Sequence, residues 1–376
     1  MKKLRRKPLP ASLFGIKMDL KKALHPPPEQ EKRLSEEEQR LLQDISFKTK
    51  QMNVNNVTRT MAYLDFYRFY PEIHWAFLGH MVSRNGGWNM TDLRGDLHSR
   101  LMNEKTKKIF FAFLERGNWL IFQDAYPQFL LYAKSMKQGR SFFHLLPYLN
   151  VSAFMEVMWN QFWKKRDSYT LAMAHIINEQ NYVESRIVQH PAYKNKVFHT
   201  LEFVLQDLFS FNHILFPFHE GDKTLLTGLT LHHFGSLHER IMLGKRLYSL
   251  LFRNQKQWEN IFHWAITHPH TGSRKDYWPF IFNDINEGMP GGIFQRRLKN
   301  CQLKKGASKI YSPRLEHAWK NIDHLPAEHG DWFTHLSVID YLKKETNMIN
   351  GEIVSEYCET LENLELVALA KKTLFI

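Results

Sequence analysis

The sequence predicts an all-α protein: a large multi-helix globular body with a flexible basic N-terminal arm. Apolar residues recur every three or four positions over long stretches, as in Val54-Val57-Met61-Leu64-Tyr67, and this spacing places them on one face of a helix. Strand-like alternation is scarce. Aromatic residues make up 14% of the chain, too many for a disordered protein dominated by charge. We therefore expect many helices around a large apolar core.

The N-terminal segment differs in composition from the rest of the chain. Residues 1–34 contain ten Lys and Arg against three Asp and Glu, and so hold seven of the +13 net charges. Together with Pro8, Pro10 and the triplet at 26–28, this composition resists packing into a core. We predict a disordered basic arm over 1–34 and a single α-helical domain over 35–376.

Within this arm, four apolar residues recur at helical spacing. They are Leu13, Ile16, Leu20 and Leu24, with lysines between them. The pattern is typical of a short basic amphipathic helix that forms on contact with a partner. A solubilising tail with a chance pattern is the alternative interpretation.

Local signals mark where helices begin. Ser35 is followed three residues later by Glu38, and this spacing is typical of a capping box, in which the Ser and Glu side chains bond each other's backbone NH groups. Proline suits the first turn of a helix, where NH groups have no intrahelical partner. We therefore predict further helix starts at Pro71, Pro127 and Pro313.

Cysteine content and hydropathy bear on the cellular compartment. Cys301 and Cys358 are too few and too far apart for a disulfide framework or a four-cysteine zinc site, which favours a reducing compartment. The apolar stretch Leu13–Ile16 that follows the first basic residues is too short for a signal-peptide core. No run of about 18 apolar residues occurs, so we expect no transmembrane segment. The prediction is a cytoplasmic protein.

The most distinctive stretch, residues 55–96, mixes apolar helix patterns with many polar residues. His80 and Arg84 are four residues apart and share a helix face, and we expect a tight turn at Gly86-Gly87 that leads to Asp92. An imidazole, a cation and a carboxylate could together bind an anionic group or transfer a proton. These three residues are our catalytic candidates.

Binding candidates in the same stretch are Arg59, Asn85 and Asn89, which would line a polar pocket over residues 59–96. A structural interpretation stands beside this one. Arg84 and Asp92 would then anchor the turn as an ion pair, and His80 would cap a helix or pack in the core.

A metal or cofactor has weak support. Among the 20 histidines, the best alignment is Glu328, Asp331 and His335, whose steps of three and four would share one helix face, although a glycine at 330 weakens that helix. A few such alignments are expected by chance. The sequence has no Glu-x-x-His, His-Glu-x-x-His or Gly-x-Ser-x-Gly motif, so di-iron, zinc-peptidase and serine-hydrolase chemistry lack their usual residues. No cofactor is indicated, and no metal is expected.

The segment Thr58–Gly95 contains RTMAYLDFYRFYPEIHWAFLGHMVSRNGGWNMTDLRG and resembles an uncharacterised Bacillus family, the YppC-like domain of unknown function. The resemblance covers roughly residues 45–360 and implies a cytoplasmic bacterial protein. It carries no activity and no catalytic residue onto these positions.

Three hypotheses for the function remain. The first is a helical binding or scaffold protein whose aromatic-rich grooves receive a partner. The second is an enzyme of unfamiliar type that acts on an anionic substrate in the pocket around residues 59–96. The third is a peripheral role at an anionic membrane or nucleic acid through residues 1–34. The sequence leaves open whether the protein is an enzyme, and the partner could be another protein or an anionic surface.

Overall fold

The computed structural model describes residues 9–25, 33–191, 212–221, 223–288, 294–344 and 349–374. Helices form most of it, which confirms the predicted all-α class. The first eight helices are α1 (Phe14–Leu24), α2 (Glu36–Met52), α3 (Asn56–Phe69), α4 (His74–Asp92), α5 (Asp96–Leu101), α6 (Glu104–Gln138), α7 (Ala153–Lys165) and α8 (Ser168–Val183). The later ones are α11 (Leu237–Phe252), α12 (Gln255–Thr267), α13 (Leu315–Ala318) and α14 (Val354–Leu374).

Short elements connect these helices. The 3₁₀ turns are η1 (Ala11–Leu13), η2 (Phe143–Leu149), η6 (Arg274–Asp276) and η7 (Leu336–Leu342), and η3 (Glu184–Val188) is a π-helical turn. The strands are β1 (His213–Glu220), β2 (Lys223–Thr230), β3 (Phe282–Asn283), β4 (Leu298–Lys299), β5 (Gln302–Leu303) and β6 (Ile310–Tyr311). Across the described ranges, none of the helices combines the length and apolar character needed to cross a bilayer.

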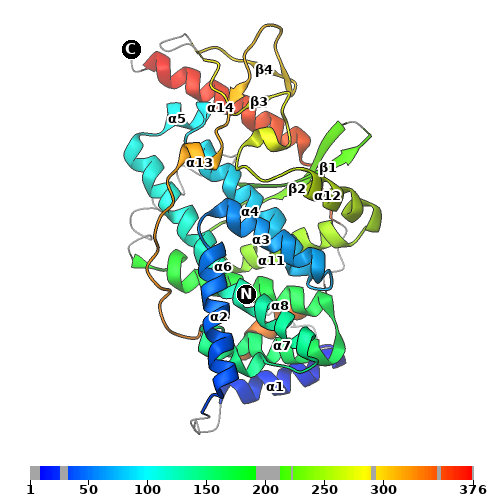
Figure 1. Ribbon diagram of the computed structural model, residues 1–376. Helices are drawn as coiled ribbons and strands as arrows, with labels where there is room; N and C mark the ends of the chain where they lie inside the picture. Colours follow the sequence, from blue (N-terminus) through cyan, green and yellow to red (C-terminus); the bar gives the residue numbers. More distant parts are fainter. Residues whose placement is uncertain are drawn as a thin grey trace, which may run out of the picture.

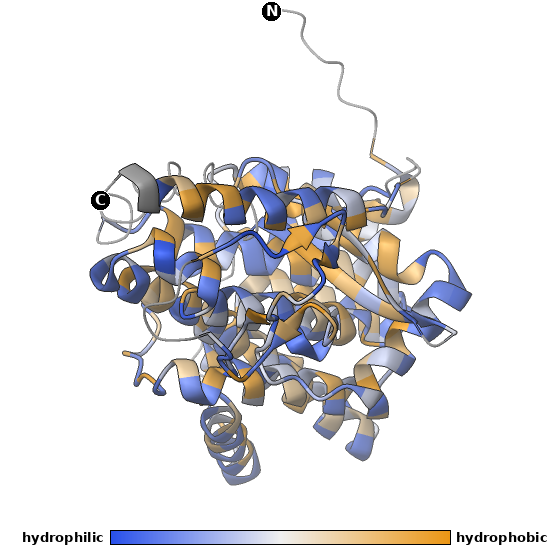
Figure 2. Cartoon of the chain, turned by 90° about the horizontal axis from the view of Figure 1, so that it is seen from above, coloured by the Kyte–Doolittle hydropathy of each residue, from blue (hydrophilic) through white to orange (hydrophobic). Residues whose placement is uncertain are grey.

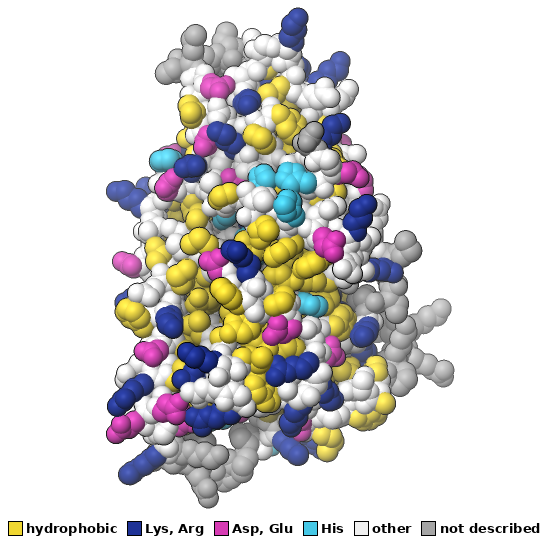
Figure 3. Space-filling view, turned by 45° about the vertical axis from the view of Figure 1, so that its right-hand side comes forward, with side chains coloured by type: hydrophobic (Ala, Val, Ile, Leu, Met, Phe, Trp, Pro, Cys, Tyr) yellow, Lys and Arg dark blue, Asp and Glu magenta, His cyan; other side chains and the backbone are white. Residues whose placement is uncertain are grey.

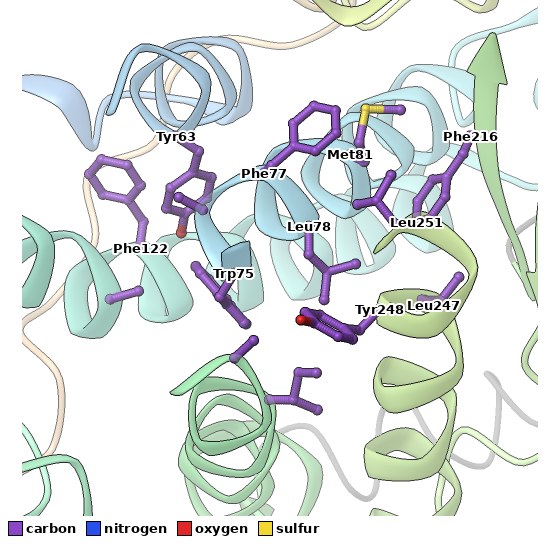
Figure 4. Close-up of a cluster of buried hydrophobic side chains, with 14 of the residues drawn as sticks. Tyr63, Trp75, Phe77, Leu78, Met81, Phe122, Phe216, Leu247, Tyr248 and Leu251 are labelled. Atoms are coloured by element: carbon purple, nitrogen blue, oxygen red, sulfur yellow. The ribbon is translucent and has the colours of Figure 1, made fainter. Parts of the chain in front are cut away.

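The elements form an elongated body with α4 near its middle (Figure 1). Helices α1, α7 and α8 lie at one end, α5 and α14 lie at the other, and α6 runs between them. Most helices in Figure 2 carry hydrophilic and hydrophobic residues in alternating bands, as expected for helices with one buried face. The buried apolar side chains form one cluster from Leu13 to Ala368, and Figure 4 shows where α3, α4, α6, α11 and β1 meet in it.

Helix α4 is the centre of the packing, because almost all of its residues are buried. The predicted turn at Gly86-Gly87 is wrong, since the helix runs through both glycines to Asp92. Instead, the absence of a side chain at these glycines allows other side chains to approach the helix backbone closely. A Cβ atom on Gly87 would lie 2.3 Å from Asn56 Oδ1 and 2.4 Å from His270 Nε2, so no larger residue fits between these side chains.

The predicted helix start at Pro127 is also wrong, because Pro127 lies inside the 35-residue helix α6. Tertiary packing overrides the local signal here: Pro127 and its neighbours are buried in the core. The other start signals agree better with the structure. Ser35 and Glu38 form the predicted capping box, and Pro71 and Pro313 stand just before α4 and α13.

The N-terminal segment is not a free arm over residues 9–25. Helix α1 forms there as the apolar spacing predicts, and it packs on α7 with Leu13, Ile16 and Leu20 buried. The basic residues before position 9 and the proline triplet lie outside the described residues. Burial of one helix face explains the difference, because the body supplies the contact surface that the segment lacks alone.

Two further features were missed in the sequence. Strands β1 and β2 pair antiparallel from His213–Thr230 to Glu220–Lys223, and Gly221 at the connection has φ +60°, which suits a hairpin turn. Cys301 and Cys358 form a disulfide with a Cα–Cα distance of 5.2 Å. The sequence argued only against a disulfide framework, and this single bond was not predicted: the fold brings α14 beside the β4–β5 turn, although 57 residues separate the two cysteines.

Candidate functional site

The two leading candidates on α4 contact each other. Arg84 Nε donates to His80 Nε2 at 3.0 Å, and His80 Nδ1 lies 2.7 Å from the Thr60 carbonyl oxygen. Both side chains are only 1% exposed. Burial, together with the nearby Arg84 charge, holds the pKa of His80 well below its ordinary value. His80 is therefore neutral, with its proton on Nδ1.

Arg84 also holds the end of α12. Its Nη2 donates to the carbonyl oxygens of Ala265, at 3.2 Å, and of His268, and its guanidinium stacks 4.6 Å from the centroid of the Trp264 ring. A cation at a helix C-terminus is favourable because that end carries partial negative charge. Burial lowers the pKa of Arg84 to about 10, so it stays charged at neutral pH and anchors the helix.

Asp92 belongs to a separate cluster, two turns further along α4. Its carboxylate accepts from Arg274 Nε at 2.8 and 2.9 Å and from Arg274 Nη2 at 2.6 Å. Arg274 also donates to the hydroxyls of Tyr277 and Tyr357, at 2.7 and 2.8 Å, and to Asn89 Oδ1 at 3.2 Å. The structure therefore brings His80 and Arg84 together and leaves Asp92 apart.

The binding candidates are also divided. Asn85 bonds both backbone groups of Leu215, with distances of 2.9 and 2.8 Å, and so joins β1 to α4. Arg59 Nη2 lies 2.6 Å from both Glu115 carboxylate oxygens in a pair that is almost fully buried. Arg59 and Asn89 line a cavity, described below, while Asn85 does not.

The three weak metal candidates do not share a helix face, because residues 319–335 run as irregular chain. Asp331 accepts from the backbone of Ala153 and Phe333, at 2.7 and 2.8 Å, and caps the start of α7. Glu328 lies 3.2 Å from His190, and His335 bonds Thr334. Within the described part of the chain, no group of three His, Cys, Asp or Glu could hold a metal ion.

A cavity of about 250 Å³ lies beside these paired groups. Helices α3, α4, α6, α8 and α11 supply most of its wall, with β1 and the segments next to the hairpin closing one side. Most of the lining is aromatic or aliphatic, including Trp75, Leu78, Phe110, Phe113, Phe234 and Leu247. Figure 4 shows part of this wall, where Tyr63 extends from α3 toward Trp75 on α4, their ring centroids 5.5 Å apart.

Unsatisfied polar groups face this cavity. The Tyr63 hydroxyl is buried and has no hydrogen-bond partner. The Nε of Arg59 also lacks one, although the charge of Arg59 is matched by Glu115. Buried polar atoms in proteins are almost always bonded. Two such atoms at one apolar cavity indicate a place for a ligand or a water molecule.

Glu179 contributes a carboxyl group to the cavity wall. The Trp75 indole and the Gln180 amide hydrogen-bond its carboxylate, the latter at 2.9 Å. Burial raises the pKa of Glu179 to about 7, while nearby Arg240 lowers it in part. The carboxyl group therefore changes its charge near neutral pH.

Glu179 and Tyr63 were not predicted from the sequence as site residues. Tyr63 sits in an apolar helix pattern that predicts a core residue, and it is one. Glu179 had a usable signal in the sequence: it follows closely on the run LAMAHII over residues 171–177, in which six of seven residues are apolar. A carboxylate on a helix that is apolar all round has no solvated face, so it lies in the interior or at a cavity.

The fold and the site define a helical protein with a mostly apolar cavity between its helices. By comparison with known proteins, the chain belongs to a family described as protein of unknown function (DUF2515), whose model matches residues 51–363. It is 45% identical over 295 residues to the uncharacterised protein YppC of Bacillus subtilis, which covers 78% of this chain and 83% of that protein. The predicted YppC-like family is thereby confirmed. No solved structure matches the chain.

Proposed function

We propose that this protein is a helical binding protein whose cavity takes up one small, mostly apolar molecule. The observation that carries the proposal is the cavity of about 250 Å³ with the unpartnered Tyr63 hydroxyl and the Glu179 carboxyl on its wall. Ligand sites in helical proteins are commonly apolar spaces between helices with a few polar groups that orient the ligand. The proposal narrows the hypothesis of aromatic-rich grooves that receive a partner.

The size of the cavity sets the size of the ligand. An apolar cavity of about 150 Å³ holds benzene. A cavity of about 250 Å³ then suits a molecule with roughly ten non-hydrogen atoms, if the same packing applies. Phenylbutanol has this size and a single polar group.

A cavity-filling variant tests the proposal. Leu243 on α11 lines the cavity, and Leu243→Trp should fill it and weaken phenylbutanol binding at least tenfold in calorimetry. Arg246 is exposed on the same helix, so Arg246→Trp is a matched control that should bind as the wild type does. Equal affinity in all three proteins would place the molecule elsewhere and contradict the proposal.

An enzyme built on His80, Arg84 and Asp92 has less support. Both ring nitrogens of His80 are bonded to protein groups, Arg84 bonds His80 and two backbone carbonyls and keeps only its Nη1 without a partner, and Asp92 binds Arg274 in a different cluster. A His80→Gln variant that lost turnover of a substrate but kept its fold would reverse this preference.

A second candidate function is docking to an anionic membrane through α1. Its outward face presents Phe14 and Met18, 55% and 56% exposed, beside exposed lysines at positions 17, 21 and 22. Lys and Arg also crowd the lower end of the face in Figure 3, the end at which α1 lies in Figure 1. Apolar and basic side chains on one surface helix are typical of membrane-surface binding.

Vesicle sedimentation tests this candidate. The double variant Phe14→Ser, Met18→Ser should lose binding to phosphatidylserine-rich vesicles, whereas Phe69→Ser should not, since Phe69 is 81% exposed on α3. Binding should weaken as salt rises. Retained binding in the double variant, or equal binding to neutral vesicles, would contradict the membrane hypothesis.

We further propose that the protein acts in the cytoplasm, and the Cys301–Cys358 pair offers a test. Disulfides are rare in reducing compartments, so the Cys301–Cys358 bond should be reduced in the cell, and both thiols should be alkylated when cells are lysed in a denaturing solution of an alkylating reagent. A protein recovered without alkylation at these positions would favour an oxidising compartment and contradict the proposal.

A further inference from the structure

We infer that the ligand of the cavity is an organic cation with an apolar body, such as a primary amine on an aromatic or aliphatic chain, and that Glu179 is its counter-ion. The inference rests on the proposed function, because it names the class of molecule bound in the same cavity. Charge balance, hydrogen bonding and the aromatic lining each support it.

Charge balance around the cavity leaves one carboxylate unmatched. Arg59 pairs with Glu115 at 2.6 Å. Arg240 pairs with Glu184 and also bonds Gln180 at 3.0 Å and the Phe234 carbonyl at 2.6 Å. Each of these two cations therefore has its own anion. Glu179 is left over, so an ionised cavity wall carries a net negative charge.

Other charged groups near Glu179 do not supply the missing cation. Asp124 on α6 adds repulsion rather than attraction, and its own pKa is raised to about 7 by burial. His175, one turn earlier on α8, has its pKa lowered to about 3 by burial and is neutral. Among the residues that the structure describes, no cation without a carboxylate partner lines this cavity.

Hydrogen bonding leaves room for a donor at the carboxylate. The Trp75 indole and the Gln180 amide occupy two acceptor positions of Glu179, and an ionised carboxylate has about four. The Tyr63 hydroxyl, which interacts electrostatically with Glu179, has no partner and offers one more acceptor. An ammonium group has three donors and would satisfy both residues.

The aromatic lining suits the same ligand. Tyr63 and Trp75 lie next to Glu179, and Phe110, Phe113 and Phe234 cover the wall further along. A cation over the face of an aromatic ring is attracted by the ring quadrupole, most strongly for Trp. The free Nε–H of Arg59 is the feature that favours an anion instead, so an acid is a necessary comparison.

Three probes with one body and different head groups test the inference: phenylbutylamine, phenylbutanol and phenylbutyrate. At pH 8 the amine should bind at least tenfold more tightly than the alcohol, and the acid should bind most weakly. The amine keeps its charge below about pH 10, so its affinity should rise about tenfold from pH 6 to pH 8 as Glu179 ionises. Glu179→Gln should remove both the preference for the amine and the pH dependence of its affinity.

The outcomes separate this inference from the function on which it rests. If all three probes bind with equal affinity, or if the acid binds best, the protein has a ligand cavity and the cationic class is wrong. If none of the three binds the wild-type protein, the proposed function itself fails. The comparison of probes on the wild type needs no variant, so a poorly folded Glu179→Gln protein would not prevent the decision.

Discussion

His80 and Asp92 on α4 and Tyr63 on the cavity wall are buried, and Glu179 beside Tyr63 is partly buried, but these groups differ in how far their hydrogen-bonding capacity is satisfied. His80 and Asp92 have bonding partners at 2.6 to 3.0 Å from residues of other elements or the same helix. At the cavity, Tyr63 has none, and Glu179 has a pKa raised to about 7. Buried polarity alone therefore does not identify a functional site. Unmet bonding capacity next to open volume is the more selective criterion.

The largest expected effect comes from breaking the Asp92 cluster. Arg274→Met would leave the Asp92 carboxylate buried without its cation, which typically costs about 3–5 kcal/mol of stability. Urea unfolding measures it. Arg40→Met is the matched control, because the Arg40–Glu36 pair is 77% and 87% exposed and such pairs contribute at most about 1 kcal/mol. Equal losses in the two variants would mean that Asp92 has solvent or another partner.

At the cavity, a substitution is expected to raise the stability of the protein rather than lower it. The pKa of Glu179 is raised to about 7 from 4.5, so the folded protein binds a proton more tightly than the unfolded chain. The resulting stability is fully present below pH 4.5 and is lost as the pH rises through 7, about 3 kcal/mol in all. Glu179→Gln lacks this loss and should be more stable than the wild type at pH 8.

The gain in Glu179→Gln should shrink steadily as the unfolding measurements move from pH 8 to pH 4. Exposed Glu36→Gln provides the control, since its side chain is 87% exposed and should show no such trend. A Glu179→Gln variant that is less stable than the wild type at pH 8 would mean that the ionised carboxylate stabilises the fold, like the paired groups of α4.

Much of the fold could be predicted from the sequence, and the site could not. Apolar spacing and the Ser35 capping signal depend on neighbouring residues, so helices α1, α2 and α3 were predictable. The continuous helix at Gly87 was not, because its cause is the close approach of Asn56 and His270, which are distant in sequence.

The prediction of the functional site from the sequence failed for the same reason. His80 and Arg84 were correctly placed on one helix face, but the groups that satisfy them, such as the Ala265 carbonyl, come from another part of the chain. The cavity is empty volume between five helices, and no local pattern describes it. Of the six residues selected beforehand, Arg59 and Asn89 line it.

A smaller effect is expected from acid. Burial lowers the pKa of His175 to about 3, so unfolding lets this residue take up a proton below pH 6.5. Its contribution to stability is present above pH 6.5 and is lost as the pH falls, by about 2 kcal/mol at pH 5. His175→Phe should reduce the fall in unfolding free energy between pH 7 and pH 5 by this amount. An unchanged slope would mean that His175 is already protonated in the folded protein.

The smallest effect on stability is expected for Tyr63→Phe, and Tyr277→Phe is the comparison. Tyr63→Phe removes a hydroxyl that has no partner, so stability should stay the same or rise slightly, by less than about 1 kcal/mol. Tyr277→Phe removes a hydroxyl bonded to Arg274 and Tyr357, each at 2.7 Å, and should cost about 1–3 kcal/mol because buried partners are left unsatisfied. Urea unfolding curves of the two variants measure both changes in stability. A loss in Tyr63→Phe as large as in Tyr277→Phe would mean that a water molecule or a retained ligand already bonds the Tyr63 hydroxyl. Repeating the unfolding measurement with phenylbutylamine bound distinguishes these two cases. Only if Tyr63 contacts the ligand should the Tyr63→Phe variant bind the amine more weakly than the wild type does.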